Sequence, residues 1–516
     1  MSVPFPSGYV PSLYPEIAIA VRLGVGAIPA RNDYTVVLLG NKTSAGSATA
    51  ATISEVFGPE DANAQAGARS EIAHMARAWF RAAPRGRVKI CPVAEGDTPV
   101  AATAVLLFAT TAAANGVVRV RINGRSLPEV GITSGDTAGT IASAVEAMID
   151  LYTDLPCTAN VSTATVTFTA AQAGPRGNDL RIVVEIVPAG STAVATTIAL
   201  NGESAAAKVD GYFGAGTATA GSVADDYTAA LAAVNLDEVD FVVAACNDDT
   251  NRGLVSAHVT AASGIAEGRR RVCVFGSIEA TLATVQADAV AHNNPLAHVE
   301  HLKGAHNTTG EIAAAYTAAR IYGDGRLKGI VQYTAANQNG LQLFPSIYAP
   351  DVTARLTRTQ KAALLADGVT PLEASALNPG YAQVSRPATT RTVAASGAKS
   401  YAVIDPSKVT VAFELANRIE SFASVAYAGK NLAPNPVDTD STPTSDDVIW
   451  PDAIRDDIVA IMRTMEDEGK LVDVNTHAAN VAVAASPTDN SVAVASGRFA
   501  LTAHSHSFVV GLDQVG

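Results

Sequence analysis

The sequence predicts an α/β core with a mainly parallel sheet, an inserted β-rich α+β domain, a C-terminal α+β domain that ends in strands, and an extended N-terminal arm. Three observations lead to this prediction. Short apolar runs alternate with amphipathic helical patterns in two separated parts of the chain, a β-rich stretch lies between these parts, and the last residues repeat a strand pattern. The predicted boundaries are 1–26 for the arm, 27–96 and 205–400 for the discontinuous core, 97–204 for the insertion and 401–516 for the C-terminal domain.

The first part of the core has the pattern strand, helix, strand. Thr35–Gly40 is a short apolar run, typical of a strand buried on both faces. A helix begins at Ser70, carries apolar residues at three- and four-residue spacing, and stops at Pro84. Val88–Cys91 supplies the second strand. This alternation implies parallel strands joined by helices.

The insertion is predicted from strand patterns that interrupt the alternation. Val117–Ile122 precedes an Asn123-Gly124 turn, a strong hairpin signal. Thr163–Thr169 and Leu180–Val187 are further strands, and one helix lies near Ile141–Ile149. We interpret this stretch as a small α+β domain placed in a loop of the core.

The second part of the core resumes the alternation of strands and helices. Thr308 and Glu311 form a capping-box pattern at the start of a helix that ends at Gly323. The preceding elements are helices at Tyr227–Val234, Arg252–Glu267 and Leu282–Val290 and strands at Phe241–Cys246 and Val272–Phe275. Residues 333–398 are predicted to be rich in loops.

The C-terminal domain is predicted to contain helices and then strands. One helix covers Lys408–Ser421 and another begins at Pro451, a residue suited to the first helical turn. Val481–Ala484 and Val492–Ala495 flank a Pro-Thr-Asp-Asn turn and predict a hairpin, and Arg498–Val510 is a further strand.

Both ends of the chain therefore offer strands that need partners. In the N-terminal arm Ile17, Ile19 and Val21 would share one face of a strand. The unpaired backbone groups of such a strand can be completed by a neighbouring chain.

The amino-acid composition limits the classes of function that the chain can have. Charged residues make up 16% of the chain, against about 25% in a typical soluble protein, so much of the surface must be Ala, Ser, Thr and Gly. Such a surface is readily buried against other subunits, although Ala-biased coding would give the same composition. The net charge of −13, without clustered Lys and Arg, argues against nucleic-acid binding.

Neither an export signal nor a membrane segment is expected. The first ten residues lack the basic and apolar regions of a signal peptide. Thr98–Val118 carries no charge, but its many Ala and Thr residues favour strand and loop over a membrane helix. The cysteines, Cys91, Cys157, Cys246 and Cys273, show no CxxC spacing and are expected to be buried reduced thiols.

The search for catalytic motifs favours a protein without enzymatic activity. Neither a GxxxxGK[ST] phosphate loop nor a GxSxG nucleophile elbow is present, and Ser263 before Gly264 fits ordinary turn chemistry. We expect no catalytic residue and no cofactor. The acidic run Asp438–Asp457 lacks EF-hand spacing and fits a solvated loop or, alternatively, a polar docking surface.

A histidine-rich stretch is the best metal candidate in the sequence. Its strand-like pattern sends His298 and His301 to opposite faces, so we expect no metal there. A second pair, His504 and His506, fits a solvated or intersubunit strand better than a pair of ligands. The members of the first stretch are His292, His298, Glu300, His301 and His306.

The order of these parts resembles the tail sheath protein of contractile-tailed bacteriophages, of the Mu-like branch. No single motif is diagnostic, but the resemblance spans nearly the whole chain in the same order. It is carried by Tyr34–Gly40, the helix Ile72–Ala83 with Gly86–Val93, Gly323–Arg326, Asp405–Arg418, Trp450–Ile454 and Met465–Gly469.

The resemblance implies a structural virion protein that assembles helically around a tail tube and contracts to drive the tube through the host envelope. The implied partners are further copies of the chain, the tail tube protein, and baseplate and tail terminator proteins, with no nucleic acid and no membrane insertion. The implied location is the virion tail, after assembly in the host cytoplasm. An insertion placed in a loop would face outward.

The resemblance also suggests two sets of contact residues. The family links its subunits by terminal arms that add strands to neighbours, which implies intersubunit strands at Ile17, Ile19, Val21, Val492, Val494, Phe499, Leu501, Phe508 and Val510. The helix from Pro451 is the candidate for tube contact, through Asp452, Arg455, Asp456 and Arg463. Two alternatives remain open, an α/β enzyme with an unrecognised site and a surface-layer or adhesin subunit.

Overall fold

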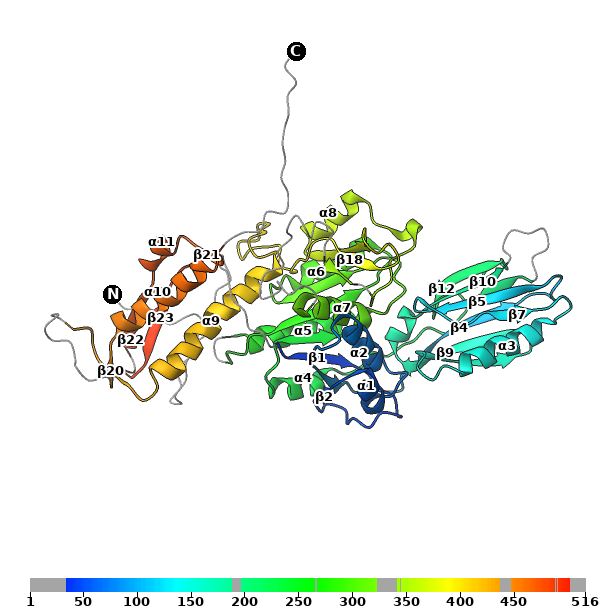
Figure 1. The fold of residues 1–516 in the computed structure, drawn as a ribbon, viewed down its shortest axis with the longest axis horizontal. Coiled ribbons are helices and arrows are strands. Elements are labelled where there is room, and N and C mark those ends of the chain that lie inside the picture. The colour runs from blue at the N-terminus through cyan, green and yellow to red at the C-terminus, as the bar shows by residue number, and fades with distance from the viewer. Residues whose placement is uncertain are drawn as a thin grey trace, which may run out of the picture.

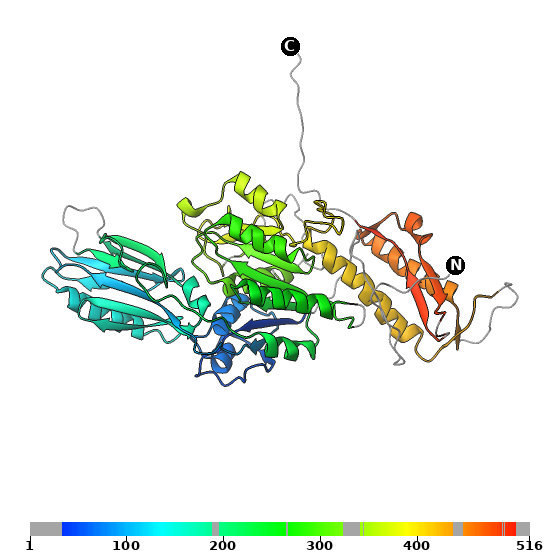
Figure 2. The ribbon, with the colours of Figure 1, turned by 180° about the vertical axis from the view of Figure 1, so that it is seen from behind.

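The structure is a computed structural model with a mixed α/β fold, and the mixed α/β class predicted from the sequence is confirmed. Figures 1 and 2 show an elongated molecule with the insertion at one end, the large sheet in the middle and the C-terminal helices at the other end. The structure describes residues 34–187, 196–264, 267–322, 341–343, 345–436, 447–487, 489 and 491–501. The expected arm at 1–26 lies outside the described residues.

The central sheet has nine strands in the order β16-β18-β17-β15-β14-β13-β1-β3-β2. The strands from β17 to β3 in this order run parallel, whereas β16, β18 and β2 pair antiparallel at the edges. Their bounds are β1 Val36–Gly40, β2 Ser54–Val56, β3 Val88–Pro92, β13 Phe241–Ala244, β14 Val272–Ser277, β15 Ala297–His301, β16 Leu341–Gln342, β17 Val369–Ala374 and β18 Ala382–Val384.

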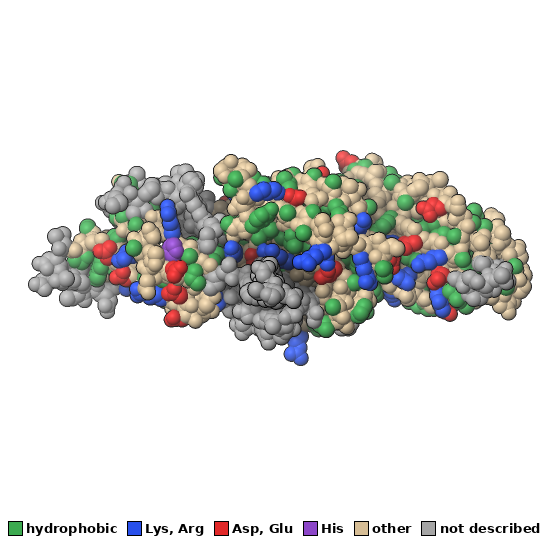
Figure 3. Space-filling view, turned by 90° about the horizontal axis from the view of Figure 1, so that it is seen from above, with side chains coloured by type: hydrophobic (Ala, Val, Ile, Leu, Met, Phe, Trp, Pro, Cys, Tyr) green, Lys and Arg blue, Asp and Glu red, His purple; other side chains and the backbone are tan. Residues whose placement is uncertain are grey.

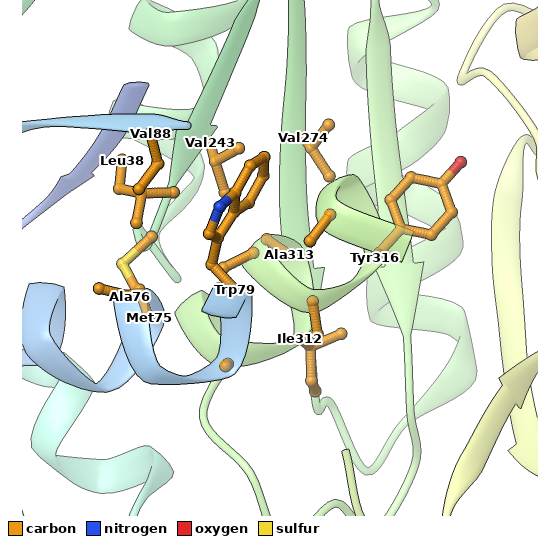
Figure 4. Close-up of a cluster of buried hydrophobic side chains, with 14 of the residues drawn as sticks. Leu38, Met75, Ala76, Trp79, Val88, Val243, Val274, Ile312, Ala313 and Tyr316 are labelled. Carbon is orange, nitrogen blue, oxygen red and sulfur yellow. The ribbon is translucent and has the colours of Figure 1, made fainter. Parts of the chain in front are cut away.

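Helices cover both faces of this sheet. On one face α2 (Glu71–Ala82) and α7 (Thr309–Tyr322) pack Trp79 and Ile312 against Leu38, Val243 and Val274, as Figure 4 shows. On the other face α4 (Thr228–Asn235), α5 (Asp249–Ala262) and α6 (Leu282–His292) cover the alternate strand residues. A central strand is therefore apolar at every position, which explains the continuous run in β1.

The predicted helix starts are confirmed by their caps. The Ser70 hydroxyl accepts a hydrogen bond from the Ala73 N–H at the start of α2. At the start of α7 the Glu311 carboxylate accepts from the Thr308 N–H at 2.9 Å, so the capping box is formed. Helix α1, Pro59–Ala66, packs beside α2.

The loop-rich prediction for residues 333–398 was wrong for part of that range. The described residues there include α8 (Arg358–Ala366), which begins with a capping box of Thr357 and Gln360, and the strands β17 and β18. Strand β17 was not predicted because it contains Pro371, and proline is rare in central strands. Pro371 lies where β17 changes partner from β15 to β18, so no continuous ladder crosses it.

The residues between β3 and β13 form two separate sheets around their own apolar cluster. One sheet has the order β12-β10-β5-β6, with β7 also paired to β5, and the other has the order β11-β4-β9-β8. Strand β12 extends this part of the chain past Ser204, where the sequence placed its end. The bounds are β4 Ala101–Phe108, β5 Gly116–Ile122, β6 Arg125–Ser126, β7 Val130–Ile132, α3 Ala138–Asp150, β8 Cys157–Ser162, β9 Thr165–Ala173, β10 Arg181–Val187, β11 Ile198–Leu200 and β12 Lys208–Tyr212.

The predicted hairpin turn at Asn123-Gly124 is confirmed between β5 and β6. Both residues have positive φ, 47° and 75°, as a type I′ turn requires. The uncharged stretch Thr98–Val118 contains β4 and the start of β5. Among the described residues no helix has both the length and the apolar character to cross a membrane.

The C-terminal part packs around a smaller apolar cluster that includes Leu415, Met462 and Met465. Helix α9 connects it to the core, because Val409 packs with the core and Val411 with the C-terminal cluster. The predicted hairpin is present, with Ala484 opposite Val494. The bounds are α9 Pro406–Ala426, β19 Asn431–Leu432, β20 Val448–Ile449, α10 Pro451–Asp467, β21 Leu471–Val472, α11 Val474–Ala478, β22 Ala482–Ala485, β23 Ala493–Ser496 and β24 Ala500–Leu501.

Candidate functional site

The first candidate site lies at the carboxyl ends of the parallel strands. Open parallel sheets bind ligands there, at the point where the strand order reverses. In this sheet the reversal lies between β1 and β13, because β1 leads to β3 on one side and the chain later returns to β13 on the other side. Asn41 follows β1 and Asn247 follows β13, so these two side chains mark the place where a ligand would be expected.

This place is filled by Arg176, which belongs to the short 3-10 helix η1 (Pro175–Asp179) of the insertion. The guanidinium forms ion pairs with Glu71, the first residue of α2, and with Asp225. Asn41 donates a hydrogen bond to Asp225 at 2.7 Å. The side chains of Arg176, Glu71 and Asp225 are 7%, 9% and 3% exposed, so the network is closed to solvent.

Asp179, at the end of η1, ties the same segment to the core. It accepts hydrogen bonds from the Thr309 hydroxyl at 2.9 Å and from the Asn247 amide at 3.2 Å. Burial raises the pKa of Asp179 to about 6 and that of Glu71 to about 7, even though Arg176 lowers both. Asn247, which follows β13, and Thr309, the first residue of α7, therefore bind the insertion to the core.

A small cavity of about 30 Å³ remains beside Arg176, lined by residues that include His74 and Gln172. A volume of this size has room for ordered water. The buried His74 Nε2 and Gln172 Nε2 atoms have no hydrogen-bond partner in the described residues and would suit such a water. At the carboxyl edge of the sheet these contacts thus join the insertion to the core, and we call the network of Arg176, Asp179, Glu71 and Asp225 the joint.

The predicted separation of His298 and His301 is confirmed in β15. His298 Nδ1 lies 3.1 Å from Nη1 of Arg320 in α7, whereas His301 Nδ1 lies 3.3 Å from Oγ of Ser277 at the end of β14. Burial lowers the pKa of both imidazoles, that of His301 to about 4. Within the described ranges no group of three or more His, Cys, Asp or Glu side chains could hold a metal ion. His504 and His506 lie outside those ranges.

The cysteines and Ser263 have the structural roles expected from the sequence. All four cysteines are free and buried, and burial raises the pKa of Cys91 to about 11 and that of Cys157 to about 12. These thiols stay protonated at neutral pH and are poor nucleophiles. The Ser263 hydroxyl accepts a hydrogen bond from the Arg271 N–H at 2.9 Å and lies within hydrogen-bonding distance of the carbonyl oxygens of Arg269 and Arg271, which stabilises a turn.

The second candidate site is the set of C-terminal strands. Val494 of β23 and Leu501 of β24 are buried and pair within their own chain, with β22 and β21 respectively. Val492 is half-buried before β23, and Phe499 packs against the C-terminal cluster. The other expected strand residues, Ile17, Ile19, Val21, Phe508 and Val510, lie outside the described residues.

These two-stranded sheets leave backbone edges without a strand partner in the part of the chain that the structure describes. Strand β22 pairs with β23 by one edge only, and the outer edge of each has no further strand among the described residues. An edge of this kind offers a row of N–H and C=O groups to an incoming strand. Within the described residues, the outer edges of β22 and β23 are therefore places where a further strand could pair.

The residues suggested for tube contact lie along α10. Asp452, Asp456 and Arg463 are exposed, and Arg455 is half-buried and forms an ion pair with Asp456 at 3.2 Å. Arg463 donates to the Asn475 side chain at 3.4 Å. The opposite side of α10 buries Met462 and Met465, so its charged side is the one available to a partner.

Comparison with known proteins points to one class, the tail sheath proteins. The chain is 28% identical over 147 residues to the Mu-like prophage FluMu tail sheath protein of Haemophilus influenzae, a match that covers 28% of this chain and 30% of that relative. The match thus spans less than a third of the relative's length. No family model matches the chain.

Solved structures of tail sheath proteins are also similar to this chain. The sheath tail protein of Desulfitobacterium hafniense is 13% identical with a TM-score of 0.44, covering 95% of this chain and 100% of that one. The contracted helical sheath of the anti-feeding prophage is 10% identical with a TM-score of 0.46, covering 98% and 99%.

The resemblance predicted from the sequence is therefore confirmed: the chain is similar to tail sheath proteins, and in particular to that of a Mu-like prophage. These relatives are structural proteins and not enzymes. The filled carboxyl edge of the sheet agrees with this and counts against the alternative of an α/β enzyme.

Proposed function

We propose that this chain is the subunit of a contractile tail sheath, which assembles helically around a tail tube and contracts to drive the tube through a host envelope. The observation that carries this proposal is the similarity over 147 residues to the sheath protein of a Mu-like prophage. The sparse charge agrees with it, because Figure 3 shows a surface on which acidic and basic side chains are scattered among uncharged ones. Such a surface can be buried against neighbours without stranding many ions.

Strand exchange between neighbouring copies would hold the sheath together. The outer edges of β22 and β23, which have no further strand among the described residues, would accept strands from the arms of neighbours. These strands would come through Ile17, Ile19 and Val21 at one end of the chain or Phe508 and Val510 at the other. Such a contact joins different surfaces and does not close on itself, so it extends into a helical filament.

The remaining parts would take the roles expected from the resemblance. The insertion would project outward from the helix, and α10 would face the tail tube through Asp452, Arg455, Asp456 and Arg463. Baseplate and tail terminator proteins would cap the two ends of the sheath in the virion tail, after assembly in the host cytoplasm.

Contraction requires two packings of the same rigid parts, with the terminal arms keeping the subunits connected. The extended state would be a kinetic trap that the baseplate releases. Burial of apolar surface at about 25 cal/mol per Å² would supply part of the free-energy difference between the two packings.

Negative-stain microscopy of the overexpressed chain tests this proposal. We expect ordered tubes from the full chain and their loss on deletion of residues 1–25 or of residues 502–516, with an unchanged melting curve of the core. The second deletion spares β24, which ends at Leu501, so the C-terminal cluster stays intact. Tubes formed equally well by both truncated chains would contradict strand exchange, and a full chain that stays monomeric would contradict the sheath role.

A further inference from the structure

The two outer sheet faces of the insertion differ in charge. On the sheet β11-β4-β9-β8 the outward residues of three neighbouring strands form a grid with three rows, none of which holds a charged side chain. The rows follow from the register and are Thr103, Thr169 and Thr158, then Val105, Thr167 and Asn160, then Leu107, Thr165 and Ser162. We call this surface the threonine grid.

The threonine grid is open to solvent in the single chain. Leu107, Thr158, Asn160 and Ser162 are exposed, and the other members are half-buried, as expected within a sheet face. The alternate residues of the same strands, such as Leu106, Val166 and Phe168, fill the apolar cluster on the inner side. The grid is therefore a true outer face, formed by the strict alternation of these strands.

The opposite sheet of the insertion shows what an ordinary solvated face looks like in this chain. In its register Arg119 lies opposite Glu185, which lies opposite Lys208, and Arg121 and Asp210 occupy the next row. Arg119 also pairs with Glu129 at 2.6 Å, with both side chains about half exposed. The lack of charge on the grid is therefore specific to that face, because the same insertion carries charged rows on its other side.

We propose that the threonine grid is a contact surface for a second copy of this chain within the polymer. The inference rests on the proposed sheath function, which supplies the polymer. Burying the grid desolvates no charge and immobilises mainly short side chains, so the cost of forming a contact is small.

The small area of the grid favours a tethered neighbour over a freely diffusing partner. With strands about 4.8 Å apart and a rise of about 3.3 Å per residue, the grid measures roughly 14 Å by 17 Å, or about 250 Å². Stable complexes of independent proteins bury about 800 Å² per partner. A surface this small holds only a partner already kept nearby by other contacts, and a neighbouring copy linked through its arms meets that condition.

Cysteine labelling tests this contact in the full chain. Thr167→Cys places a thiol at the centre of the grid, and Val117→Cys is the matched control on the outer face of the opposite sheet. The native cysteines are buried and add little background. We expect both thiols to react with a maleimide-polyethylene glycol in unassembled protein, and only the thiol at position 167 to react about tenfold more slowly in assembled tubes.

A second pair of variants tests the same contact by placing a charged side chain on one face or the other. Thr167→Lys should disorder or abolish tubes, whereas Val117→Lys, with the same change of charge, should not. Tubes in which the thiols at positions 167 and 117 react equally fast would overturn the grid contact alone. Failure of the unmodified chain to form any polymer would overturn the proposed function and, with it, this inference.

Discussion

Arg176 of the insertion and Glu71 at the start of α2 form a buried ion pair at the carboxyl edge of the central sheet. The two residues are 105 positions apart in the sequence, yet each is more than nine-tenths buried. Through this pair the insertion occupies the place where an α/β sheet ordinarily binds a ligand. The joint therefore fixes the insertion to the core at this place.

Replacing Arg176 with Ala should destabilise the protein strongly. The change leaves Glu71 and Asp225 buried without their cation, and breaking a buried pair in this way costs about 3–5 kcal/mol. Urea unfolding followed by circular dichroism measures the loss. The matched control is Arg119→Ala, which breaks the half-exposed pair with Glu129 and should cost less than about 1 kcal/mol. Equal losses in the two variants would contradict the assignment of Arg176 as the joint.

The joint should also make stability depend on pH. The pKa of Glu71 is raised in the folded state from 4.5 to about 7, and that of Asp179 from 3.8 to about 6. The folded protein binds more protons than the unfolded chain in this window, so this stabilisation is complete below about pH 4 and is lost as the pH rises through 6 to 7. In Glu71→Gln the free energy of unfolding should vary less between pH 5 and 7, as measured by urea titrations at each pH. An unchanged slope would show that Glu71 does not titrate there.

Local patterns in the sequence predict most of the elements but not the joint between them. Thr308 with Glu311, and Asn123 with Gly124, signal a helix start and a hairpin turn because each pattern acts within four residues. Arg176 has no such signal, since its partners are contributed by α2 and by the loop before α4. The C-terminal hairpin was predictable from its alternation. That the outer edges of β22 and β23 have no further strand among the described residues follows only from the pairing in three dimensions.

The threonine grid could be predicted from the sequence only in part. Thr165, Thr167 and Thr169 repeat with a period of two in the sequence and predict one face of a strand. Whether β4 and β8 place uncharged residues beside them depends on the register, which the sequence pattern alone does not set. A charged neighbour in either strand would have made the same threonines part of an ordinary solvated face.

Two glycines provide a matched test of the packing between sheet and helices. A Cβ atom at Gly276, in β14, would lie 2.0 Å from the Thr309 carbonyl oxygen at the start of α7, so Gly276→Ala must push the two elements apart. Gly253 lies within α5, and a Cβ atom there meets no atom within 4 Å. We expect Gly276→Ala to lower the melting temperature. Gly253→Ala should instead stabilise the protein by about 0.5–1 kcal/mol, because alanine favours the helix. A Gly276→Ala variant that melts like the unmodified chain would contradict the close approach.

The C-terminal cluster should be sensitive to the loss of a single side chain. Met465 of α10 is fully buried among Leu415 of α9, Leu471 of β21 and Leu501 of β24, so Met465→Ala leaves a cavity and should cost about 2–5 kcal/mol. Because α9 carries the connection to the core, the loss should appear first as faster hydrogen exchange in α10 and β21, with β1 and β13 unchanged. Leu236→Ala, at a side chain that is 84% exposed, is the control and should change neither exchange nor melting. Since β22 contacts α10 and pairs with β23, the proposed strand acceptor would be lost with the cluster. Met465→Ala should therefore form fewer tubes at the temperature where its exchange rises. Normal tubes from a variant whose α10 exchanges freely would separate assembly from this cluster and place the strand acceptor elsewhere.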